Sequence, residues 1–313
     1  MGHYRKEAYE MIWGYLVHLS YNMWRDREVP GVPTHLCYKP YLRFDHSLWE
    51  DLCVSMRDAG VNVVVIDLGD GVRYRTHPEI AVQGAWSPER LREELHKLRQ
   101  LGLEPIPKLN FSATHDAWLG PYARQVSTDV YYRVCADLIQ EVIDLFDKPR
   151  FFHLGMDEET AQHQREYEYV VIRQYDLWWH DCLFLIKQVR DAGVRPWLWS
   201  DYMWHHRDEF LARMPKDVLQ SNWWYDETLN PDLCQVQAYI DLAKAGYEQI
   251  PTGSNYFNSK NFEATVAFVR DNHLEQSVLG ILQTPWKPTQ EEFRQAHKEA
   301  LEQVARGRVL WAS

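Results

Sequence analysis

Paired cysteines are missing from this sequence of 313 residues. Its five cysteines are odd in number, and no two of them stand at the C-x-x-C spacing that is typical of zinc sites and redox centres. We therefore expect reduced thiols in place of a disulfide framework, which is usual for a reducing compartment.

Long apolar runs are missing as well. Residues 1–24 contain many apolar side chains, but polar residues such as Tyr15, His18 and Asn22 interrupt them, unlike a secretory signal peptide. No later run approaches the roughly 18 consecutive apolar residues that a membrane-spanning helix needs. We therefore expect a cytoplasmic protein without a membrane partner.

Positive charge is scarce. The chain has 34 Lys and Arg against 45 Asp and Glu, which gives a formal net charge of -11. Neutralising nucleic-acid phosphates requires clustered basic residues, and no such cluster is present. We therefore expect no nucleic-acid partner, while a hydrophobic content of 45% is ample for a folded core.

Short β-rich runs alternate with longer segments whose apolar residues recur every three or four positions. The expected strands are 14–21, 61–68, 103–110, 150–156, 194–200, 217–224, 247–254 and 278–285. The expected helical segments are 47–60, 87–102, 128–146, 175–193, 233–246, 261–272 and 289–307.

This alternation predicts an α/β fold, a single (β/α)8 TIM barrel. We expect one catalytic domain over residues 1–313, with a barrel core at about 14–306 and no separate N-terminal domain. The alternative is a doubly wound open sheet, but the segment LSYNMWRD after the first strand lacks the glycine-rich phosphate loop usual there.

Tryptophan is abundant, with 14 residues. Six of them lie at or after the ends of expected strands, where the loops of a barrel gather to form its active face: Trp24, Trp118, Trp199, Trp223, Trp224 and Trp286. A buried Trp usually belongs to the core. Flat aromatic faces also hold sugar rings, so the pattern favours a carbohydrate pocket.

The segment RFFHLGMDEET, residues 150–160, ends an apolar run with three adjacent acids. At a strand end that turns into a loop, Asp157 and Glu158 can both reach the barrel mouth in different surroundings. A protonated carboxyl can protonate a departing glycosidic oxygen while an ionised one steadies positive charge on the sugar. The alternative is a helix N-terminus, where acids meet the helix dipole favourably.

The stretch from His153 to Glu158, HLGMDE, resembles the H-x-G-G-D-E motif of family 20 glycoside hydrolases, the β-N-acetylhexosaminidases, with Met156 in place of the second glycine. Further segments are similar to that family's third, fifth, seventh and eighth strands, in the same order along the chain. They are PIPKLNFSATH, PWLWSDY, GSNYFN and PWKP.

The resemblance implies an exo-acting, retaining and substrate-assisted glycosidase without a metal or cofactor, whose substrate is an amino-sugar glycoside. Asp157 would orient the substrate's 2-acetamido group, and Glu158 would be the general acid/base. The expected substrate-binding and supporting residues are Arg25, His115, His153, Trp199, Trp223, Trp224, Tyr256, Asn258 and Trp286.

The sequence also departs from the family. Asn258 and Pro288 stand where family members commonly carry acids for sugar hydroxyls, and we expect no counterpart of the family's usual small α/β domain before the barrel. A glycosidase for sugars lacking an acetamido group, or a carbohydrate-binding barrel without turnover, therefore stays open.

A metal-dependent barrel hydrolase is a further alternative, and the oligomeric state also stays open. The residues available to such a metal site are His115, His153, Asp201, His205 and His206. Against it, the first strand lacks an H-x-H pair, and adjacent histidines cannot easily face one ion.

Overall fold

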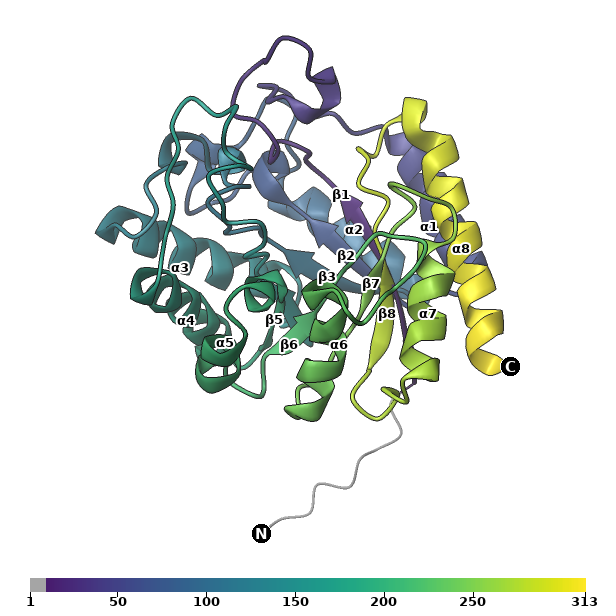
Figure 1. Ribbon diagram of the computed structural model, residues 1–313. Helices are drawn as coiled ribbons and strands as arrows, with labels where there is room; N and C mark the ends of the chain where they lie inside the picture. The colour runs from purple at the N-terminus through teal and green to yellow at the C-terminus, as the bar shows by residue number, and fades with distance from the viewer. Residues whose placement is uncertain (1–9) are drawn as a thin grey trace.

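Eight parallel strands form the centre of the computed structural model, which describes residues 10–313 (Figure 1). They are β1 (Ile12–His18), β2 (Val63–Asp67), β3 (Glu104–Lys108), β4 (Phe151–His153), β5 (Arg195–Trp199), β6 (Leu219–Ser221), β7 (Thr252–Gly253) and β8 (Gly280–Gln283). Each lies in or overlaps an expected strand segment, so the strand prediction is confirmed.

The strands close into a barrel. Their order is β6-β5-β4-β3-β2-β1-β8-β7, and parallel bridges such as Trp223 to Thr252 join β6 to β7. The Ile250 amide donates to the Gln220 carbonyl at 2.9 Å across the same junction. The expected (β/α)8 barrel is therefore confirmed, and the open-sheet alternative is wrong.

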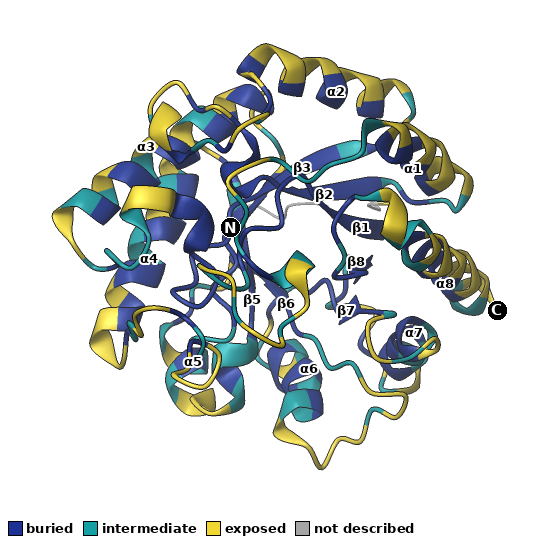
Figure 2. Ribbon diagram, turned by 90° about the horizontal axis from the view of Figure 1, so that it is seen from above, coloured by how far each residue is buried: buried dark blue, intermediate teal, exposed yellow. Residues whose placement is uncertain are grey.

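Helices surround the barrel and turn their apolar sides toward the strands (Figure 2). They are α1 (His46–Asp58), α2 (Pro88–Gln100), α3 (Asp129–Leu145), α4 (Asp176–Asp191), α5 (Arg207–Arg213), α6 (Cys234–Lys244), α7 (Asn261–Asp271) and α8 (Arg294–Ala312). Helix α5 was not among the expected segments. It has 7 residues and buries only Phe210, which is too little apolar periodicity to recognise in a sequence.

Three other expectations concern the cysteines, membrane-spanning helices and the range of the domain. The five cysteines are free thiols, as expected. Between residues 10 and 313, every helix is too short or too polar to cross a membrane. The expected domain range of 1–313 includes residues 1–9, which lie outside the described residues.

A layer of ionisable side chains fills the barrel below its mouth. His18, Asp67, Lys108 and His153 occupy neighbouring register positions on β1 to β4. Lys108 is fully buried and forms an ion pair with Asp67. Burial alone would raise the pKa of Asp67, but Lys108 and His18 outweigh burial and lower it. Successive inward positions on a strand are two residues apart, so Asn110 follows Lys108 one layer nearer the mouth.

Replacing Lys108 tests this layer, because a buried ion pair that loses one partner leaves an uncompensated charge. We expect Lys108→Met to lower the free energy of unfolding by about 3–5 kcal/mol in urea titrations. The double variant Asp67→Leu/Lys108→Met should recover much of that loss, since no charge stays unpaired. A double variant less stable than Lys108→Met alone would contradict this account.

Candidate active site

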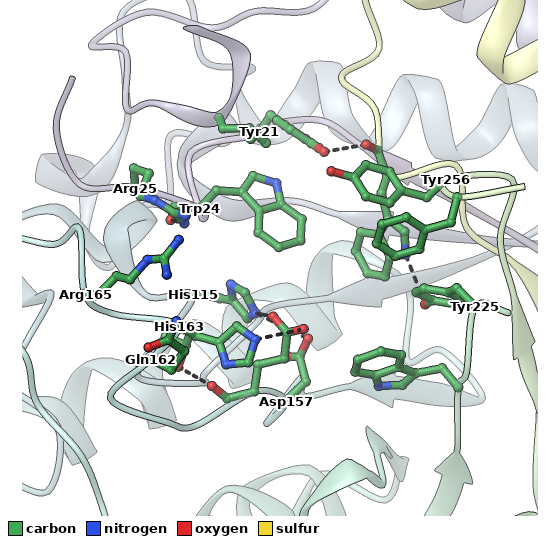
Figure 3. A pocket seen from close by; sticks show the side chains of 16 residues that line it. Tyr21, Trp24, Arg25, His115, Asp157, Gln162, His163, Arg165, Tyr225 and Tyr256 are labelled. Atoms are coloured by element: carbon green, nitrogen blue, oxygen red, sulfur yellow. Dashed lines mark hydrogen bonds and ion pairs between the residues drawn. The ribbon is translucent and has the colours of Figure 1, made fainter. Parts of the chain in front are cut away.

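A cavity of about 400 Å³ opens at the carboxyl ends of the strands (Figure 3). The acids lie on its floor, with aromatic side chains on one side and the guanidinium groups of Arg25 and Arg165 on the other. The lining residues are Tyr21, Trp24, Arg25, Leu36, Thr114, His115, Asp157, Glu158, Gln162, His163, Arg165, Trp223, Tyr225, Tyr256, Phe257 and Trp286.

The turn after β4 presents both acids to the cavity. Gly155, Met156 and Glu158 have φ angles of +74°, +73° and +55°, in the left-handed region. A Cβ on Gly155 would overlap Asn110, so this position requires glycine. Because the chain coils here, Asp157 and Glu158 do not alternate between two faces as residues of a strand do.

Asp157 lies deep in the cavity, and side chains from the loop after β3 hold its carboxylate in place. The Asn110 side-chain amide donates to its Oδ1 at 2.9 Å, and His115 Nε2 lies 3.4 Å from its Oδ2. Burial alone would raise the pKa of Asp157, but His115, Lys108 and the Asn110 amide together lower it. Asp157 is therefore ionised at neutral pH.

Glu158 lies between two imidazole rings and is more open to the cavity. Its Oε2 is 3.3 Å from His115 Nε2, and its Oε1 is 3.5 Å from His163 Nε2. The Glu158 side chain is 21% exposed, compared with 8% for Asp157. The two adjacent acids therefore differ in both solvent access and partners.

His115 is the cation that both acids share. Burial alone would lower the pKa of His115, but the charges and hydrogen bonds of Asp157 and Glu158 outweigh burial and raise it to about 10. The His115 ring also meets the edge of the Trp24 ring, with 5.0 Å between their centroids. An imidazolium is therefore held beside the acids through neutral pH.

The third acid of the cluster, Glu159, points away from the cavity. Its side chain is 4% exposed and forms an ion pair with Arg173, which also donates to Asp181 at 3.1 Å. These contacts tie the long loop between β4 and α4 to the helical layer. Glu159 is therefore a structural acid.

Aromatic side chains form the opposite wall. Trp223 and Tyr225 stack with 5.1 Å between ring centroids, and Trp286 Nε1 donates to Tyr225 Oη at 3.0 Å. Tyr21 Oη donates to the Trp286 carbonyl at 2.6 Å. Tyr256 lies at the rim and is 41% exposed. Such a wall suits the apolar face of a sugar ring.

Most of the residues predicted for the site line this cavity. They are Arg25, His115, Asp157, Glu158, Trp223, Tyr256 and Trp286. They come from the loops after six different strands, so the barrel brings together residues that lie far apart in the sequence. Their roles in binding or catalysis stay predictions.

Two predicted residues, His153 and Trp199, lie below the cavity and not on its wall. His153 is fully buried, as expected for a supporting residue inside the barrel. Trp199, expected on the wall, is 1% exposed and packs between His153 and Trp286, with centroid distances of 4.4 and 6.0 Å. It sits deeper because β5 ends there, before its loop begins.

Trp224 and Asn258 also do not line the cavity. Trp224 follows Trp223 but does not reach the cavity; the Trp204 ring contacts both, with centroid distances of 4.6 Å to Trp223 and 6.2 Å to Trp224. Asn258 donates to the Tyr225 carbonyl at 3.3 Å and accepts from the Lys260 amide at 3.0 Å, which braces the loop after β7.

Several lining residues were not predicted. Tyr21 and Tyr225 follow strands, so their positions offered a signal, whereas Trp24 was already expected at the active face as one of the tryptophans near strand ends. The remainder come from irregular loops and carry no periodic signal: Leu36, Thr114, Gln162, His163, Arg165 and Phe257.

The site also contains a group that can hold a metal ion. One ligand atom each from His115, Asp157 and Glu158 lies within 4.8 Å of the others. The other residues of the metal alternative are not in this group: His153 is below the cavity, His205 and His206 are exposed, and Asp201 accepts a hydrogen bond from the Glu158 amide. A protonated His115 cannot be a ligand, so its ion pairs with the two acids compete with metal binding.

No model of a known protein family matches this chain, and no curated protein matches it. Solved structures do share its fold. An exo β-N-acetylglucosaminidase from Vibrio harveyi, solved with N-acetylglucosamine, superposes with a TM-score of 0.62 at 14% identity, over 97% of this chain and 58% of that chain.

Two further structures are similar. A β-N-acetylhexosaminidase from Bacteroides fragilis gives a TM-score of 0.61 at 13% identity, over 94% of this chain and 66% of that one. Dispersin B superposes with a TM-score of 0.60 at 14% identity, over 94% of this chain and 98% of the Dispersin B chain. The chain thus spans under two thirds of the first two enzymes, and at such identities the likeness establishes the fold.

The raised pKa of His115 predicts a pH-dependent contribution to stability. A histidine whose folded pKa is raised stabilises the fold fully below its unfolded value, about 6.5, and loses this contribution as the pH rises toward about 10. In thermal unfolding, the advantage of the wild type over His115→Gln should therefore shrink between these two values. His96→Gln, on the exposed face of α2, is the control. An advantage that is constant with pH would contradict the ion pairs.

Proposed function

We propose that this protein is an exo-acting glycoside hydrolase of the β-N-acetylhexosaminidase type. One observation carries the proposal: Asp157 and Glu158 stand side by side on the floor of an aromatic cavity with unequal surroundings. The barrel shared with known β-N-acetylglucosaminidases and the order of the motifs support it.

Glu158 acts as the general acid in this proposal. Its carboxyl gives a proton to the glycosidic oxygen as the bond from that oxygen to the anomeric carbon breaks. In the second step, the carboxylate takes a proton from the water that attacks the anomeric carbon. Its greater access to the cavity, compared with Asp157, suits contact with the departing group.

Asp157 acts on the substrate's own nucleophile. The acetamido carbonyl oxygen attacks the anomeric carbon and forms an oxazolinium intermediate, so two displacements retain the configuration. Asp157 accepts the acetamido N–H and stabilises the positive charge that spreads onto it. Its lowered pKa and the Asn110 amide keep it ionised and oriented for this purpose.

The shape of the cavity supports an exo-acting enzyme. The packed layer of His18, Asp67, Lys108 and His153 closes the cavity from below, so a sugar can reach the acids on its floor only from the mouth of the barrel. Trp223, Tyr225 and Trp286 would hold the terminal sugar ring, while Arg25 would bind its hydroxyls. A glycosidase for sugars lacking an acetamido group remains the second candidate, because Asn258 and Pro288 replace the usual acids.

The acid role predicts a dependence on the leaving group. Glu158→Gln should slow the hydrolysis of poorly activated alkyl or sugar glycosides far more than that of dinitrophenyl glycosides, whose oxygen needs little protonation. Steady-state rates on such a series measure this. Glu159→Gln is the matched control, because it removes the neighbouring acid that points away. An equal loss on both kinds of substrate would exclude Glu158 as the acid.

The role of Asp157 predicts a loss confined to the transition state. Asp157→Asn keeps the size but removes a charge-assisted hydrogen bond, which should raise the barrier by about 2 to 4 kcal/mol, or roughly a hundredfold or more in kcat, with little change in KM. A thiazoline mimic of the cyclised intermediate should inhibit the wild type and lose potency on Asp157→Asn. A wild type that ignores the thiazoline would rule out substrate assistance.

A further inference from the structure

A third carboxyl, Asp201, lies against the catalytic pair without lining the sugar cavity. It begins the short helix η5 (Asp201–Trp204), directly after β5, and borders a neighbouring cavity of about 490 Å³. That second cavity and the first share Glu158, His163 and Trp223. Asp201 therefore lies beside Glu158 and outside the first cavity.

The contact that Asp201 makes is with the backbone of Glu158. Asp201 Oδ2 accepts a hydrogen bond from the Glu158 amide at 2.8 Å. On the other side, Thr114 Oγ1 donates to the Glu158 carbonyl at 2.7 Å. Both peptide groups of Glu158 are thus held by side chains from neighbouring loops.

Glu158 needs this support because its φ of +55° is unfavourable for a residue with a side chain. A conformation of this kind costs on the order of 1–3 kcal/mol and persists only where the surroundings impose it. In an extended conformation, the Glu158 side chain would leave the cavity floor and its place between His115 and His163. Two hydrogen bonds hold the Glu158 carbonyl, from Thr114 Oγ1 and from the Thr160 amide, whereas the bond to Asp201 is the one that holds the Glu158 amide against this relaxation.

We propose that Asp201 is a positioning residue: its carboxyl accepts the Glu158 amide and so holds the Glu158 backbone in the conformation that aims the Glu158 side chain at the leaving oxygen. The proposal rests on the proposed role of Glu158 as the general acid. In this proposal, a residue outside the sugar cavity positions the acid that lies inside the cavity.

The surroundings of Asp201 disfavour a negative charge on its carboxyl. Asp201 Oδ1 is buried and has no hydrogen-bond partner among the described residues. An ionised carboxylate there would be a further buried negative charge close to Asp157, whose own charge is paired with His115. Burial first, and then the charges of Asp157 and Glu158, raise the pKa of Asp201 well above its usual range.

Two variants distinguish the hydrogen-bond acceptor of Asp201 from its capacity to carry a charge. Asp201→Asn keeps an oxygen that accepts from the Glu158 amide and is uncharged, so kcat should stay within about threefold of the wild type. Asp201→Ala removes the acceptor, and kcat on poorly activated glycosides should fall by about 10- to 100-fold with little change in KM, because the acid is misplaced. Dinitrophenyl glycosides should lose much less.

Asp241→Ala is the matched control, since it removes a buried carboxylate that pairs with Arg207 away from Glu158. It should lower the melting temperature without creating a dependence on the leaving group. A full loss in Asp201→Asn, or wild-type rates in Asp201→Ala, would overturn the proposal. So would a loss in Asp201→Ala that is equal for all leaving groups.

Crystal structures of the two variants test the positioning role independently of activity. Glu158 should keep its positive φ in Asp201→Asn and leave it in Asp201→Ala. If the wild type hydrolyses no glycoside, the proposed function fails, and these structures still decide whether Asp201 positions Glu158. An unchanged Glu158 in Asp201→Ala would contradict the inference.

Discussion

The ion pairs between His115 and the two acids are the interaction on which the rest of the site depends. In a buried setting, Asp157 and Glu158 would repel each other strongly, and the His115 imidazolium is what allows them to stand together. Deeper charges add to this, because Lys108 also favours the ionised form of Asp157. The barrel thus holds one acid ionised at the bottom of the cavity and leaves the other near solvent.

Bringing these groups together requires a strained turn. Met156 and Glu158 adopt positive φ angles, which residues with side chains rarely do, and Asn110, Thr114 and Asp201 hold this segment through hydrogen bonds. The backbone strain lies where the two acids enter the cavity, whereas the strands around it are regular. The unusual backbone conformation is therefore confined to the turn after β4, while the barrel around it is regular. Side chains from the loops after β3 and β5 hold this turn in place.

The sequence predicted the fold because, among the described residues, hydrophobic periodicity marks every strand and every α-helix except the short α5. It predicted which strand ends carry polar and aromatic residues, since the barrel brings these ends to one face. It could not predict how deeply each of these side chains is buried below the cavity. Trp199 is buried against Trp286 and does not line the cavity, and only one of the neighbours Trp223 and Trp224 reaches it. Residues such as His163 come from an irregular loop, whose path depends on the buried pair of Glu159 and Arg173.

The central claim is that the cavity hydrolyses glycosides with the help of the substrate's own acetamido group. The most direct measurement is the release of nitrophenol from matched nitrophenyl β-glycosides that differ only in whether carbon 2 carries an acetamido or a hydroxyl group. The account predicts release from the acetamido glycoside and essentially none from its hydroxyl counterpart. Equal release from both would contradict substrate assistance, and release from neither would contradict a hydrolase.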